Sequence, residues 1–201
     1  MTLDALATLP LPGRLRRIMQ ALAMLDAVLS PEWGSRRHLF NVHWGDGEVM
    51  GSLRDGSGDE LFALFNGHGC FIKAFEHELP GARLPPDAAY AGVPAPFRAA
   101  AAEPAFSPGE VTFVCWRRME DMPWRGMGGC RFLPELDGRA STYRDFAMEY
   151  FEVDLDVETV AAVFAHVPLT PALVERLNPA ARLQTAATEA AEIGYPVSKQ
   201  G

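Results

Sequence analysis

The spacing of hydrophobic residues divides the chain into a helical start, a β-rich centre and a helical end. Over residues 13–29, Leu, Ile and Met recur every three or four positions, which predicts a helix with one apolar face. From residue 39 the period falls to two, and turns rich in Gly, Asp and Asn interrupt it. This pattern predicts antiparallel strands over residues 39–44, 48–54, 59–65 and 70–76.

The third predicted strand differs from its neighbours. Its residues 61–65 are apolar on both faces, so we expect an inner strand covered on each side, with the first helix covering one of them. A proline-rich connection follows over residues 79–110, with a short helix expected near 97–102. A fifth strand is predicted over residues 111–117 and a short one over 130–133.

The remainder of the chain predicts helices. Thr142 and Asp145 resemble a capping box, Asp156 is a candidate cap for the next helix, and Thr170-Pro171 begins a third. An Ala-rich helix is predicted over residues 183–191. The fold class is therefore α+β, with an antiparallel β-meander of about five strands covered by an N-terminal helix and a C-terminal group of helices. We expect a single domain over residues 1–201.

The charge balance narrows the classes of partner. Asp and Glu outnumber Lys and Arg by 26 to 18, which gives a net charge of −8. Phosphate backbones and anionic membranes select clustered cations, so we expect neither a nucleic-acid partner nor a membrane partner. A basic partner protein is compatible with this charge.

The three cysteines, Cys70, Cys115 and Cys130, are widely spaced and form no C-x-x-C motif. Together with an N-terminus that lacks the pattern of a signal peptide, they indicate a reducing compartment, so we expect a cytoplasmic protein. No apolar stretch approaches the ~20 residues that span a bilayer.

One loop combines residue types that are enriched at binding hot spots. Three Met, two Trp and three Arg occur between Cys115 and Cys130. Its alternative role is to pack onto the core through its aromatic rings. The candidate contacts of this loop with a partner protein are Trp116, Arg117, Met119, Met122, Trp124 and Met127.

An acidic run follows on the predicted helices. Six acidic residues and no Lys or Arg occur from Asp145 to Glu158. Part of this run fits helix capping and the helix dipole, and a solvated face is the ordinary outcome. Such a run also suits a basic partner, and the candidate contacts are Glu149, Glu152 and Asp154.

A second, alternative polar site surrounds the turn over residues 55–60. It lacks the alternating ligands and the bidentate Glu of an EF-hand, and Gly and Asp at these positions favour a hairpin turn. His77 beside a glutamate is nevertheless a candidate base or metal ligand. The residues of this alternative site are Asp55, Asp59, Glu60, His77 and Glu78. No nucleophile elbow, P-loop or dinucleotide motif occurs, so we assign no catalytic residue, no metal and no cofactor.

The central sequence resembles a family of uncharacterised bacterial proteins. The resemblance rests on N-x-x-W from Asn41, M-x-S-x-R-D-G-S-G-D-E-x-F-x-L-F-N from Met50, and G-x-x-I-K-x-F-x-H-E from Gly69. It continues through residues 103–106, 112–116, 143–150, 177–179 and 193–196, and so covers most of the chain. In size and acidity the family is similar to cytoplasmic immunity proteins of polymorphic toxin systems. The resemblance implies no role for any individual residue.

These observations favour a non-enzymatic cytosolic protein that binds another protein, of which a toxin-neutralising immunity protein is one example. The alternative is a small-molecule or metal-dependent enzyme that uses the acidic turn with His77 and Glu78.

Overall fold

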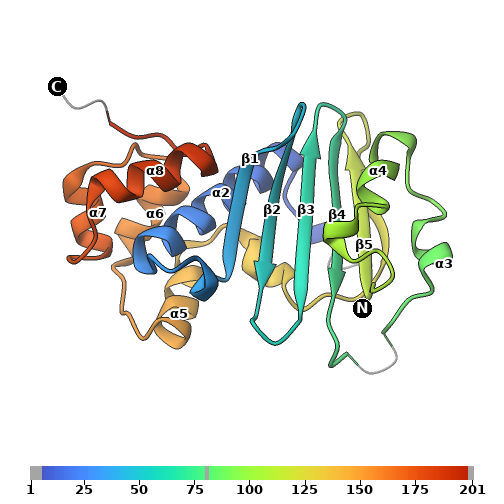
Figure 1. The fold of residues 1–201 in the computed structure, drawn as a ribbon, viewed down its shortest axis with the longest axis horizontal. Coiled ribbons are helices and arrows are strands. Elements are labelled where there is room, and N and C mark those ends of the chain that lie inside the picture. The colour runs from blue at the N-terminus through green and yellow to red at the C-terminus, as the bar shows by residue number, and fades with distance from the viewer. Residues whose placement is uncertain (1–5, 80–81, 199–201) are drawn as a thin grey trace.

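The computed structural model describes residues 6–79 and 82–198 and shows an α+β fold built on a six-stranded antiparallel sheet (Figure 1). Each strand pairs with the next one along the chain, so the sheet order is β1-β2-β3-β4-β5-β6. The strands are β1 (His38–Gly45), β2 (Glu48–Arg54), β3 (Glu60–Asn66), β4 (Gly69–Phe75), β5 (Phe113–Arg118) and β6 (Arg125–Gly128). The predicted fold class is confirmed, with one strand more than the expected five.

The acidic turn, residues 55–60, forms the hairpin connection between β2 and β3. One carboxylate oxygen of Asp55 accepts hydrogen bonds from the backbone N–H groups of Ser57 (2.8 Å) and Asp59 (3.0 Å). Gly56 and Gly58 adopt φ values of 80° and 112°, which side chains disfavour. The composition of this turn is therefore explained by hairpin geometry.

The N-terminal helix and the four C-terminal helices pack together at the β1 side of the sheet. The helix α2 (Pro12–Leu29) packs on one face of the sheet at β1 and β2. The later helices α5 (Ala140–Tyr150), α6 (Val157–Phe164), α7 (Pro171–Leu177) and α8 (Leu183–Ile193) gather beside the β1 edge, on the left of Figure 1. Because α2 lies between the sheet and this group, it is buried on nearly all sides. Within the described residues, no helix has the length and apolarity needed to cross a membrane.

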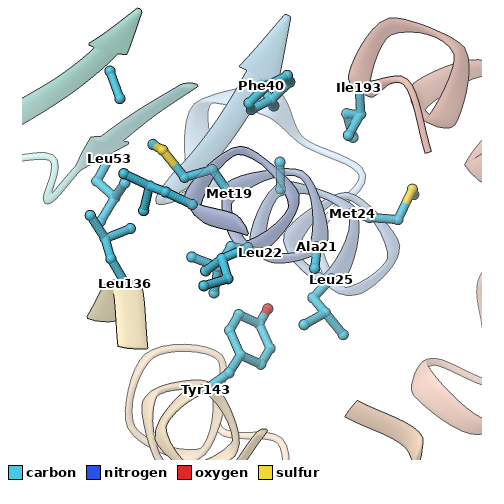
Figure 2. Close-up of a cluster of buried hydrophobic side chains, with 14 of the residues drawn as sticks. Met19, Ala21, Leu22, Met24, Leu25, Phe40, Leu53, Leu136, Tyr143 and Ile193 are labelled. Carbon is cyan, nitrogen blue, oxygen red and sulfur yellow. The ribbon is translucent and has the colours of Figure 1, made fainter. Parts of the chain in front are cut away.

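The strand β3 divides its side chains between two hydrophobic clusters, as its sequence predicts. Leu61, Ala63 and Phe65 belong to the larger cluster, which α2 completes with residues such as Met19 and Leu22 (Figure 2). Phe62 and Leu64 belong to a smaller cluster on the opposite face. Both faces of β3 are thus covered.

The proline-rich connection covers the second face of the sheet. It holds the helices α3 (Pro86–Tyr90) and α4 (Arg98–Ala101) and two short 3-10 turns, η2 (Ala95–Phe97) and η3 (Pro104–Phe106). Phe106 stacks on Phe62 with centroids 4.7 Å apart, and Trp44 stacks on Phe106 at 5.5 Å. These helices lie at β4 and β5, and the same face of β1 and β2 extends past them (Figure 1).

Two local predictions need correction. Residues 130–133 form no strand; the sixth strand lies earlier, at β6, and the 3-10 turn η4 (Leu133–Asp137) follows. The capping box at Thr142 and Asp145 is wrong, because α5 begins at Ala140 and the Thr142 hydroxyl donates to Asp137 (2.7 Å). By contrast, the predicted caps Asp156 and Thr170 are confirmed by side-chain hydrogen bonds to the first turns of α6 and α7.

Candidate functional site

The acidic turn belongs to a cluster of polar side chains that pair with one another. Asp59 is 3% exposed and accepts hydrogen bonds from the His77 backbone N–H (2.7 Å) and from its imidazole. Arg131 bridges Asp59 (3.0 Å) and the buried Glu76 (2.6 Å). The carboxylates at the centre of the alternative site therefore bind neighbours from the same chain and tie the turn to the end of β4.

The remaining residues of the alternative site have different surroundings. His77 and Glu78 are exposed, and the hydrogen bond with Asp59 raises the pKa of His77. Glu60 lies on β3, where its nearest cation is Lys73, 4.0 Å away. Among the described residues, no group of three or more His, Cys, Asp or Glu side chains is arranged to hold a metal ion.

The loop from Trp116 to Met127 divides into buried rings and exposed methionines. Trp116 is 7% exposed and packs in the smaller hydrophobic cluster. Trp124 is 6% exposed and its indole N–H donates to the Pro10 carbonyl oxygen (3.0 Å). Arg117 is half-buried, whereas Met119, Met122 and Met127 are exposed. The tryptophans thus anchor the loop, and its three methionines are exposed to solvent.

The acidic candidates Glu149, Glu152 and Asp154 lie at and just beyond the end of α5. All three side chains are exposed, and none forms an ion pair with a described residue. The exposed side chains Met148 and Tyr150 share this region, which we call the α5 acidic surface. It lies beside β1, at the opposite edge of the sheet from the loop between β5 and β6 (Figure 1). The structure therefore separates the two groups of candidate contacts.

A buried polar network that the sequence did not indicate joins α2, β1 and α5. The Asp26 carboxylate is fully buried and accepts hydrogen bonds from the backbone N–H groups of Arg37 (2.9 Å) and His38 (2.8 Å) and from the Tyr143 hydroxyl (2.7 Å). The His38 ring contacts Asp26 through Nδ1 (3.1 Å) and Glu135 through Nε2 (3.3 Å). We call this set of residues the Asp26 network.

The charges of the Asp26 network stabilise one another. Burial lowers the pKa of His38, but the Asp26 and Glu135 carboxylates raise it by more, to about 9. Burial raises the pKa of Glu135, but hydrogen bonds from Arg37 and His38 lower it to about 2. At neutral pH the imidazole is therefore a cation held between two carboxylates. The adjoining hollow encloses only about 10 Å³, so the arrangement fits a structural role.

A larger hollow, which we call the groove, crosses the β1 edge of the sheet. It encloses about 190 Å³ between β1, β2, the segment at residues 33–36 and α8. Its wall is largely apolar and aromatic, and Trp33 stands at its mouth with 57% of its surface exposed. The lining residues include Trp33, Arg36, Phe40, Asn41, Trp44, Met50, Ser52, Arg54, Glu189 and Ile193.

The polar groups of the groove differ in how far they are paired. Arg36 donates to the backbone carbonyls of Ser30 and Pro31 and forms an ion pair with Glu189. Ser52 is 1% exposed, yet its hydroxyl has no hydrogen-bond partner among the described residues, and neither has the buried Nε of Arg54. The Arg54 guanidinium lies over the Trp33 ring, 5.3 Å from its centroid. Buried polar atoms in folded proteins are usually paired.

Lys73 is the third buried side chain without a hydrogen-bond partner in the described part of the chain. It lies on β4 against the rings of Phe62 and Phe75. Burial lowers its pKa to about 8, although Glu60 acts in the opposite direction. The aromatic stack that ends on Phe62 separates Lys73 from the groove, whose lining does not include it.

The sequence offered only a partial signal for the groove. Met50, Ser52 and Arg54 alternate along β2, which places them on one face. That Ser52 and Arg54 lack partners depends on residues 33–36 and on α8, which lie far away in the sequence.

Comparison of this chain with protein-family models, with curated proteins and with solved structures finds no match.

Proposed function

We propose that this protein acts without catalysis by binding a basic partner protein through the α5 acidic surface. The observation that supports this most is the combination of exposed apolar and unpaired acidic side chains at the end of α5. Met148 and Tyr150 are 48% and 41% exposed, and they lie among Glu149, Glu152 and Asp154. Aromatic and Met anchors surrounded by charges are typical of binding interfaces.

Charge complementarity favours a cationic partner. The chain carries a net charge of −8, and the three carboxylates have no cation within ion-pair distance in the described residues. Such a surface accelerates the approach of a basic protein and disfavours an acidic one. A toxin-neutralising immunity protein is one class that would use this arrangement.

The enzymatic alternative receives less support from the geometry. Asp59 and Glu76 are engaged by His77 and Arg131, so they are poorly placed to bind a substrate or a metal ion. The exposed methionines Met119, Met122 and Met127 offer a second apolar contact, but they belong to the β5–β6 edge of the sheet, whereas α5 lies beside the opposite edge at β1 (Figure 1).

The test is affinity purification from the protein's own host with the wild type and two triple variants. Glu149→Gln/Glu152→Gln/Asp154→Asn neutralises the α5 acidic surface, and Glu32→Gln/Asp46→Asn/Asp87→Asn makes the same change in net charge at other exposed positions. We expect a stoichiometric basic protein to bind the wild type and the second variant, and to bind the first with an affinity about tenfold lower or worse. Absence of any stoichiometric partner, or equal binding by both variants, would overturn the proposal.

A further inference from the structure

The groove across the β1 edge contains an incomplete set of hydrogen bonds. The Ser52 hydroxyl and the Arg54 Nε are both buried and both lack a partner among the described residues. One residue separates Ser52 from Arg54 on β2, so their side chains project from the same face of the sheet, about 7 Å apart. An unpaired buried hydroxyl or guanidinium N–H destabilises the protein unless another molecule satisfies it.

The charges in the groove define the ligand that would do so. Two carboxylates of α8, Glu189 and Glu192, line the groove, and Glu189 is paired with Arg36, which also donates to two carbonyl groups. Arg54 therefore provides the cation with an unpaired donor, and the Ser52 hydroxyl can donate a second hydrogen bond. An anionic oxygen group suits this pair, because a guanidinium and a hydroxyl are both donors to a carboxylate.

The apolar side chains of the groove determine what kind of group the rest of the ligand carries. Trp33, Trp44 and Met50 line the groove around the two polar groups with apolar surface. The Trp44 ring is held in place by stacking on Phe106, and Trp33 lies against the Arg54 guanidinium. A flat or aromatic group can stack on such rings, and a hollow of about 190 Å³ limits it to a small molecule.

We infer that the groove is a binding site for a small aromatic carboxylate. Its carboxylate binds Arg54 and Ser52, and its ring packs between Trp33 and the wall formed by Trp44 and Met50. This site is separate from the α5 acidic surface, so it stands or falls independently of the proposed partner protein.

The test uses benzoate, phenylacetate and indole-3-acetate as probes, each compared with its neutral amide. Binding to the protein is measured by calorimetry and located by amide chemical shifts in NMR spectra. We expect at least one acid to bind with a Kd below about 1 mM, and its amide to bind at least tenfold more weakly. The shifts should centre on β2 and residues 33–36.

Three variants locate the effect. Arg54→Gln should weaken the acid at least tenfold and Ser52→Ala severalfold. Arg98→Gln, which removes one exposed cation on α4, should leave the affinity unchanged. Ser52→Ala removes an unpaired atom, so it should fold as the wild type does. Saturable binding by none of the acids, equal binding of acids and amides, or unchanged binding by Arg54→Gln and Ser52→Ala would each overturn the inference.

Discussion

Two groups of buried polar side chains adjoin the edge strand β1, and they differ in how they are paired. In the Asp26 network, four donors converge on one carboxylate, and His38 is shared between Asp26 and Glu135. In the groove, the Ser52 hydroxyl and the Arg54 Nε are also buried, but they have no hydrogen-bond partner among the described residues. A satisfied polar group specifies how elements pack, whereas an unsatisfied one is stable only at a cost that a ligand can remove.

The largest expected effect comes from breaking the satisfied group. Asp26→Ala leaves two backbone N–H groups, the Tyr143 hydroxyl and the His38 cation without their acceptor. We expect the free energy of unfolding in urea to fall by about 3–5 kcal/mol. The exposed Asp87→Ala should change it by less than about 1 kcal/mol, and a loss of that size for Asp26→Ala would contradict the structural role.

The charge on His38 predicts how stability depends on pH. The pKa of His38 is raised from 6.5 to about 9 in the folded protein, so folding favours the protonated ring. This contribution is complete below about pH 6.5 and is lost as the pH rises through 9, with a total on the order of 3 kcal/mol. NMR titration of the His38 ring measures the pKa directly, and His38→Gln should remove this part of the pH dependence. A ring pKa near 6.5 would contradict the prediction.

Lys73 extends the comparison to a charge that has no ligand site. Its pKa is lowered from 10.5 to about 8, so its buried charge opposes folding below pH 8, and this penalty disappears above about pH 10.5. We expect Lys73→Met to stabilise the protein by roughly 1–3 kcal/mol at neutral pH, measured by urea unfolding. The exposed Arg98→Met is the control, and destabilisation by Lys73→Met would show that the interaction of the ammonium with Glu60 outweighs the cost of its burial.

The fold could be predicted where the determinants are local. The continuous apolar run over residues 61–65 identifies an inner strand, and Asp156 and Thr170 identify the starts of two helices. The strand β6 was not predicted, because Gly126 and Gly128 give it no hydrophobic alternation. Backbone contact explains these glycines, since a Cβ at Gly128 would lie 2.0 Å from the Thr112 carbonyl oxygen.

The sites were less predictable, because their partners are distant in the sequence. Asp26 meets Tyr143 across 117 positions, and no local pattern marks either residue. Trp116 and Trp124 have the composition of a hot spot but serve as anchors, since composition does not reveal which side chains reach solvent. The acidic turn was interpreted from local turn chemistry, and the structure supports that interpretation.

The most direct test of this contrast removes one buried hydroxyl from each group. Tyr143→Phe deletes the donor to Asp26, and Ser52→Ala deletes the unpaired hydroxyl of the groove, with unfolding free energies measured side by side in urea without ligand. We predict a loss of about 1–3 kcal/mol for Tyr143→Phe and no loss, or a small gain, for Ser52→Ala. Equal losses for the two variants would show that the Ser52 hydroxyl is satisfied within the protein and would contradict the account.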